Sequence, residues 1–113
     1  MASSGEIQGH VDGMLLAVLS DGPLHGYGVT EELRRRSGGE FDLAEGTIYP
    51  ALHRLESSGL LISSWEVVGG RRRRVYALSA SGRRAVVDRR ASWRVFRSAV
   101  DAVFGAEAVE AGR

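Results

Sequence analysis

At 113 residues, with 43% hydrophobic and 26% charged side chains, the chain has the size and composition of one soluble globular domain. It has no cysteine, which excludes a disulfide framework, a thiolate zinc site and a cysteine nucleophile. The formal net charge is only +1, but all fifteen basic residues are arginine, and many of them stand in runs. The sequence shows neither a secretory signal nor an apolar stretch of about 18 residues, so we expect a cytoplasmic protein with no membrane partner.

Two helices are predicted in the first third of the chain. Residues 1–6 have the composition of a flexible tail, and apolar residues then recur at steps of three and four from about Ile7. The Ser-Asp-Gly-Pro run at residues 20–23 ends this helix. A second helix is expected over residues 27–37, because two glycines at positions 38–39 follow a last turn of three arginines.

A third helix is predicted to begin near residues 45–47 and to end at Gly59. We expect Pro50 in its first turn, where the missing N–H removes no helical hydrogen bond. One face of this helix is apolar and is expected to face the core; it carries Ile48, Leu52 and Leu55.

A β-hairpin is predicted after the third helix. Residues 61–68 and 72–78 are strand-like, and a Gly-Gly pair at positions 69–70 joins them. In the second strand, Tyr76 and Leu78 alternate with Val75 and Ala77, as expected for a strand with one buried face.

A fourth helix is predicted over about residues 82–104, where apolar residues repeat at steps close to seven. Arg89 interrupts this seam, and Gly105 ends the helix. So short an apolar seam requires a partner helix, and a chain of this size buries more apolar surface when two copies associate. We therefore expect a homodimer. The predicted dimer-interface or ligand-binding residues are Val86, Trp93, Phe96, Val100 and Val103.

These elements predict an α+β, mostly helical fold: a winged helix-turn-helix with a C-terminal dimerisation helix. The winged helix-turn-helix would be a DNA-binding domain over residues 7–79. Residues 80–104 would form the dimerisation helix, and residues 105–113 a flexible tail.

The predicted third helix has the composition of a DNA-recognition helix. Such helices place residues of their N-terminal end in the major groove, and the face opposite the apolar one is uncharged to basic here. Arg54 is the candidate for a bidentate guanine contact or a phosphate clamp, and Thr47 and Tyr49 suit phosphate oxygens or a thymine methyl. A solvated helix face is the alternative interpretation. The face comprises Thr47, Pro50, Arg54 and Ser57, flanked by Tyr49 and His53.

Four consecutive arginines follow the Gly-Gly turn of the predicted hairpin. They repel one another, and a bound polyanion would relieve this repulsion and release counterions. Alternation predicts that Arg71 and Arg73 lie on the opposite face of the strand from Arg72 and Arg74, so some of the four are expected to contact the domain's own acidic groups.

Three motifs resemble the signature of PadR-type transcriptional regulators, in the order and spacing of that family. They are residues 24–28 (LHGYG), 46–61 (GTIYPALHRLESSGLL) and 69–79 (GGRRRRVYALS). The resemblance runs from about residue 15 to residue 103 and is closest to the smaller members, which have a single C-terminal helix. It implies a bacterial, cytoplasmic homodimer that binds palindromic double-stranded operator DNA, usually as a repressor.

The resemblance also implies roles for individual residues. It places Thr47, Tyr49 and Arg54 on the recognition helix, Tyr27 near the start of the second helix, and Arg71, Arg72 and Arg73 on the wing. Trp93 is similar to a tryptophan that some multidrug-responsive members place at the dimer interface, where planar aromatic ligands stack. An aromatic small-molecule effector is therefore one implied partner, whereas a plain core role for Trp93 is the alternative.

Other kinds of site are not indicated by the sequence. Its three histidines, at positions 10, 25 and 53, share neither a helix face nor a ligand spacing, so no metal is expected, and His25 is expected to cap or pack at the second helix. Neither a phosphate-binding glycine loop nor a Ser-His-Asp arrangement is present, so we expect no cofactor and no enzyme. The acidic pair of the second helix is expected to form the ion pairs Glu31–Arg35 and Glu32–Arg36.

Two functions of other classes remain compatible with the sequence. A winged helix can dock its recognition face on an acidic protein surface instead of DNA. A dimer can also sequester an aromatic ligand through Trp93, with DNA binding lost.

Overall fold

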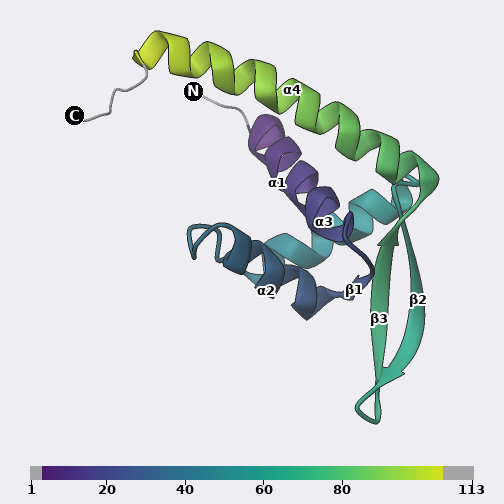
Figure 1. The fold of residues 1–113 in the computed structure, drawn as a ribbon. Coiled ribbons are helices and arrows are strands. Elements are labelled where there is room, and N and C mark those ends of the chain that lie inside the picture. Colours follow the sequence, from purple (N-terminus) through teal and green to yellow (C-terminus); the bar gives the residue numbers. More distant parts are fainter. Residues whose placement is uncertain (1–3, 106–113) are drawn as a thin grey trace.

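Helix α1 lies between the long C-terminal helix α4 and the pair formed by α2 and α3. The sheet lies at one end of these helices (Figure 1). The computed structural model describes the backbone of residues 4–105 and the side chains of residues 9–105. The elements are α1 (Ser4–Leu19), β1 (Leu24–His25), α2 (Gly26–Arg36), α3 (Glu45–Ser57), β2 (Leu61–Val68), β3 (Arg71–Leu78) and α4 (Ala80–Phe104). This order of three short helices, a hairpin and a long helix confirms the predicted α+β winged helix-turn-helix.

One hydrophobic core joins the three short helices to the sheet. Each of these three helices buries one apolar face, as the sequence pattern predicted for α3, and the most deeply buried side chains are aliphatic. The core comprises Leu15, Leu16, Val18, Leu19, Val29, Leu33, Ile48, Ala51, Leu52, Leu55, Leu61, Tyr76, Leu78 and Val86.

The predicted place of Val86 in the dimer interface is wrong. Its side chain is only 3% exposed and packs in the core of its own chain, so it offers no surface to a partner. The first turns of α4 lie across the domain, and only the later turns extend beyond it (Figure 1).

The sheet is antiparallel, with β3 between β1 and β2. The two-residue strand β1 was not predicted; it pairs Leu24 with Tyr76 and so joins the start of α2 to the hairpin. Strands β2 and β3 extend away from the helices as a wing (Figure 1). Its turn is formed by Gly69 and Gly70, whose φ angles of 59° and 77° are those that a tight hairpin turn requires.

The starts of two helices differ from the prediction. Helix α1 begins at Ser4, so half of the expected N-terminal tail is helical, whereas residues 1–3 and 106–113 of the expected tails lie outside the described part. Helix α3 begins at Glu45, and Pro50 is therefore in its second turn, not its first. Its ring leaves the carbonyl of Gly46 without a helical donor, which is tolerated because Gly46 is exposed to water.

Two contacts fix the direction of α4. At its start, the hydroxyl of Ser79 accepts a hydrogen bond from the Gly82 N–H at 3.0 Å and donates one to the Gly59 carbonyl at 2.6 Å. Farther along, Arg89 Nη1 donates to the Gly9 carbonyl of α1 at 2.5 Å. Within the described residues, no helix is long and apolar enough to span a membrane.

Candidate nucleic-acid interface

The outer face of α3 is exposed and carries small polar groups. Because Ile48, Leu52 and Leu55 are buried, the residues on the opposite side of the helix face solvent. Among the predicted site residues, Thr47 and His53 lie in this exposed set. The exposed residues of the face are Gly46, Thr47, Pro50, His53 and Ser57.

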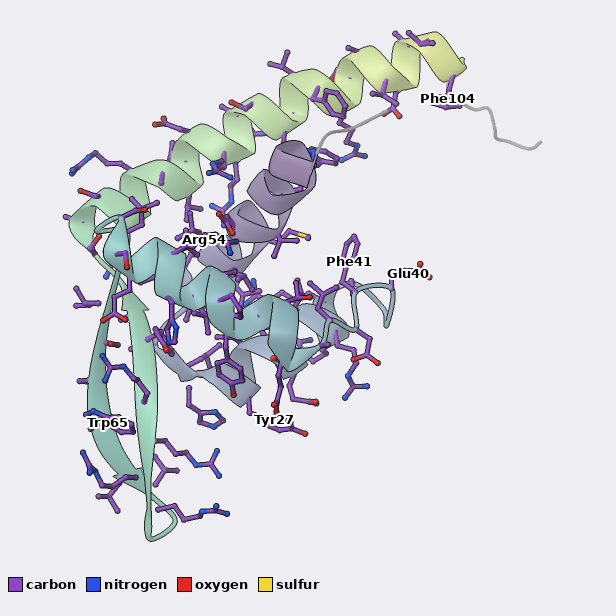
Figure 2. All side chains as sticks on the ribbon, turned by 180° about the vertical axis from the view of Figure 1, so that it is seen from behind. Tyr27, Glu40, Phe41, Arg54, Trp65 and Phe104 are labelled. Atoms are coloured by element: carbon purple, nitrogen blue, oxygen red, sulfur yellow. The ribbon has the colours of Figure 1, made fainter. Side chains whose placement is uncertain are left out.

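Tyr49 and Arg54 lie on the two flanks of α3 and point in different directions. Tyr49 is half-buried against the start of α2, so close that a Cβ on Gly26 would lie 2.3 Å from its Cε1. Arg54 Nη2 donates to Asp12 Oδ1 of α1 at 2.9 Å. In Figure 2, Tyr27 lies on the side of α3 that faces the wing tip, whereas Arg54 lies on the other side, toward α1 and α4. This position disfavours the predicted base contact of Arg54.

The start of α2 contributes a second group of polar and aromatic side chains. His25 Nδ1 accepts a hydrogen bond from the Gly28 N–H at 3.1 Å, which confirms the predicted capping role. Tyr27 follows with 58% of its surface exposed, and its ring stacks on the His25 ring at a centroid distance of 6.4 Å. The exposed tyrosine thus stands beside the wing on a capped helix start.

The four wing arginines divide between two faces, as the alternation predicted. Arg72 and Arg74 stack over Trp65, with guanidinium carbons 4.7 and 5.3 Å from the ring centroid. Arg74 also pairs with Glu56 of α3 at 3.5 Å, so it contacts the domain's own acidic surface. On the other face, Arg71 is exposed near the tip, and Arg73 is part-buried, with Nη1 3.3 Å from His25 Nε2.

The charges of α2 are largely paired with one another. Glu32 pairs with Arg36 at 3.1 Å, as predicted, and also with Arg35. Glu31 pairs with Arg34 at 2.7 Å and not with Arg35, so the second predicted pair is wrong. Hydrogen bonds from Arg35 and Arg36 lower the pKa of Glu32 from 4.5 to about 2. These arginines are therefore already committed to carboxylates, in contrast to Arg71.

Tyr76 was not predicted as a site residue, yet it lies at the base of the wing beside this group. Burial of its side chain raises the pKa of the Tyr76 hydroxyl, and the nearby Glu56 carboxylate raises it further. The phenol is therefore neutral at neutral pH and can donate a hydrogen bond.

A second candidate surface is the outer part of α4. Trp93, Phe96 and Val103 are 50%, 54% and 86% exposed, and Val100 is part-exposed on the same face. Phe104, 84% exposed, extends this face and was missed by the seven-residue pattern. The His10 ring of α1 lies edge-on to Trp93 at 5.7 Å, and the Trp93 and Phe96 centroids are also 5.7 Å apart. We name Trp93, Phe96, Val100, Val103 and Phe104 the α4 stripe.

Within the described part of the chain, no group of three or more His, Asp or Glu side chains is placed to hold a metal ion. The described geometry instead comprises a basic wing with an exposed helix start beside it, and an apolar stripe on the far helix.

Comparison with known proteins identifies relatives for most of the chain. The profile of the transcriptional regulator PadR-like family matches residues 15–88, more than half of the sequence. The Mycobacterium tuberculosis protein "Transcriptional regulator Rv3488" is 48% identical over 73 residues, which cover 64% of this chain and 65% of that relative, just under two thirds of its length. Family and relative are transcriptional regulators, in agreement with the predicted non-enzymatic role.

Several solved structures share the fold, two PadR regulators among them. A PadR family transcription regulator from Clostridium difficile is 28% identical and superposes with a TM-score of 0.74, covering 84% of this chain and 98% of its own. Bacillus subtilis PadR, solved in complex with operator DNA, is 25% identical with a TM-score of 0.64 over 70% of this chain and 45% of its own.

Proposed function

The chain belongs to the transcriptional regulator PadR-like family, and from this premise we propose that it is a cytoplasmic, homodimeric repressor that binds double-stranded operator DNA. The observation that carries the proposal is that the exposed face of α3 and the arginine-bearing wing are neighbours, with the exposed Tyr27 on the side of α3 that faces the wing tip (Figure 2). The DNA complex of Bacillus subtilis PadR supports DNA as the partner of this fold.

In the proposed complex, α3 enters the major groove with its N-terminal half. Thr47 and His53 contact bases or phosphates from the exposed face, and Tyr49 and Tyr27 contact the backbone beside it. Arg71, Arg72 and Arg73 supply the wing's charge to the phosphates, which release counterions on binding. Arg54 was predicted for a base contact, but its ion pair with Asp12 makes it a support of α3 in this proposal.

The proposed dimer forms through the α4 stripe. Helix α4 has 25 residues, which corresponds to a length of about 37 Å at 1.5 Å per residue, and its outer half lies beyond the domain. Pairing two stripes buries aromatic and aliphatic side chains that a single chain leaves exposed. A two-fold dimer would place the two α3 helices about 34 Å apart, one helical turn of DNA.

A planar aromatic effector is the proposed ligand of this dimer. Trp93, Phe96 and His10 form an aromatic cluster at the proposed interface, and two copies of it would face each other. A ligand that binds one arrangement of the subunits more tightly shifts the dimer toward that arrangement and changes the spacing of the α3 helices. Quenching of Trp93 fluorescence in a Trp65→Phe background measures such binding.

Fluorescence anisotropy with a labelled duplex from the region upstream of the gene tests the proposed function. A scrambled duplex of the same composition is the control, and both are titrated at two salt concentrations. Tight binding to the upstream duplex alone, which survives moderate salt, is the expected result. Equal binding to both duplexes that disappears with salt would instead favour an acidic protein as the partner of the wing.

A further inference from the structure

A small pocket of about 200 Å³ lies where the start of α2 meets β3 and α3. It is lined by His25, Tyr27, Tyr49, Arg73 and Tyr76, among others. These side chains come from three separate parts of the sequence: the consecutive elements β1 and α2, helix α3, and strand β3. The short strand β1 joins the start of α2 to the wing by pairing with β3. All five have hydrogen-bond donors, and none of them is a carboxylate.

The contact between His25 and Arg73 joins two donors. His25 Nδ1 accepts the hydrogen bond from the Gly28 N–H, so the proton of the neutral imidazole is on Nε2. Arginine has five donors and no acceptor. The 3.3 Å between His25 Nε2 and Arg73 Nη1 is therefore not a hydrogen bond, and both N–H groups require an acceptor from elsewhere.

Arg73 has a second unmet requirement. Its Nε atom is buried and has no hydrogen-bond partner among the described residues. A buried donor without an acceptor is costly, and a permanently charged one more so. Arg73 differs in this from Arg74, whose guanidinium has both Glu56 and Trp65 as neighbours.

We propose that this pocket binds one backbone phosphate of DNA, held by His25 Nε2–H and the Arg73 guanidinium and flanked by the Tyr49 hydroxyl. A phosphate oxygen accepts several hydrogen bonds at once, and the phosphate supplies a negative charge opposite the Arg73 guanidinium. The N-terminus of α2, an eleven-residue helix, adds its positive end. The inference rests on the proposed DNA binding, and Tyr27 at the rim of the pocket lies on the side that faces the wing tip (Figure 2).

Two substitutions of His25 separate its two nitrogens. In His25→Asn the amide oxygen takes the place of Nδ1 and keeps the helix cap, but no donor remains at the Nε2 position. In His25→Gln the amide nitrogen reaches the Nε2 position, while the cap is lost. Arg73→Gln removes the charge, and Arg90→Gln on α4 is the matched control, because it removes the same charge far from the pocket.

The probe is a fluorescein-labelled duplex of unrelated sequence, since a phosphate contact does not depend on base sequence. His25→Asn is expected to bind about tenfold more weakly than the wild type, with an unchanged dependence on salt, because a neutral group is lost. His25→Gln should retain most of the affinity despite a lower melting temperature. Arg73→Gln should reduce the slope of log K against log salt by about 0.9, and Arg90→Gln should leave it unchanged.

The outcomes distinguish the pocket from the proposed function. If the wild type binds the duplex while His25→Asn and Arg73→Gln bind as it does, the pocket holds water and the phosphate site is refuted, although DNA binding stands. If His25→Gln loses more affinity than His25→Asn, only the cap matters, and the inference again fails. If the wild type binds neither this duplex nor the one from the region upstream of the gene, both the proposed function and the phosphate site fall.

Discussion

Arg54→Ala is expected to lower the stability of the domain more than its affinity for DNA. Arg54 Nη2 lies 2.9 Å from Asp12 Oδ1, and the Asp12 side chain is only 15% exposed, whereas that of Arg54 is 40% exposed. Hydrogen bonds to charged groups contribute about 1.5–3 kcal/mol, and the partial exposure of Arg54 argues for the lower part of this range. Removal of the arginine also leaves a largely buried carboxylate without this partner. We expect the free energy of unfolding to fall by about 1.5–2 kcal/mol.

A double-mutant cycle tests this assignment. Urea unfolding is measured for the wild type, Arg54→Ala, Asp12→Asn and the double variant at one fixed protomer concentration, because a dimer's stability depends on concentration. The expected coupling energy between the two side chains is about 1 kcal/mol. Thr47→Ala is the control on the same helix: its side chain is exposed, so it should lower DNA affinity with little effect on unfolding.

One result would refute this assignment. If Arg54→Ala weakened DNA binding tenfold or more, while the unfolding free energy stayed within about 0.3 kcal/mol of the wild type, Arg54 would be a DNA contact. The guanine or phosphate role expected from the sequence would then stand, and the ion pair with Asp12 would have to open on binding.

Three further predictions concern the dimer, the packing and the charges. Val103→Glu in the α4 stripe should yield monomers in sedimentation velocity, whereas Val95→Glu, 72% exposed on the opposite face of α4, should leave the dimer intact. Gly82→Ala places a Cβ 2.1 Å from a main-chain carbonyl oxygen and should lower the unfolding free energy by about 1–3 kcal/mol. Gly9→Ala is the control within α1: its Cβ meets open space, so the substitution should raise the unfolding free energy by about 0.5–1 kcal/mol. Glu32, whose pKa is lowered from 4.5 to about 2 in the folded state, should titrate near pH 2 by NMR; its stabilising contribution is present above pH 4.5 and is lost as the pH falls toward 2.

Helices and the hairpin were predictable because their signals are local. Periodic apolar residues, the Gly-Gly turn and the caps each act within a few residues, and all of these elements are present. Strand β1 was not predictable in this way, because two residues carry no period and its existence depends on the distant partner β3. The heptad pattern of α4 failed at Val86 for a related reason: periodicity identifies an apolar face but not which surface covers it.

The candidate site was predictable in its residues and less so in their directions. A helical projection places Arg54 next to Thr47, because seven residues are nearly two turns, but only the tertiary structure shows that α1 supplies Asp12 on that flank. Wing alternation was sufficient to separate Arg72 and Arg74 from their neighbours. The close approach of His25 and Arg73 involves residues 48 positions apart, and no sequence pattern indicates it.

Helix α1 connects the two surfaces that the proposed function requires to communicate. Its Gly9 carbonyl accepts a hydrogen bond from Arg89 of α4. One turn later, its Asp12 forms an ion pair with Arg54 of α3. Both contacts are polar and directional, so α4 and α3 cannot slide independently along α1 without breaking one of them. Under the proposed function, an effector beside Trp93 that tilts α4 against its partner would therefore carry α1 and α3 with it. The half-site spacing would then change through rigid displacement of the domain and not through a rearrangement of its core.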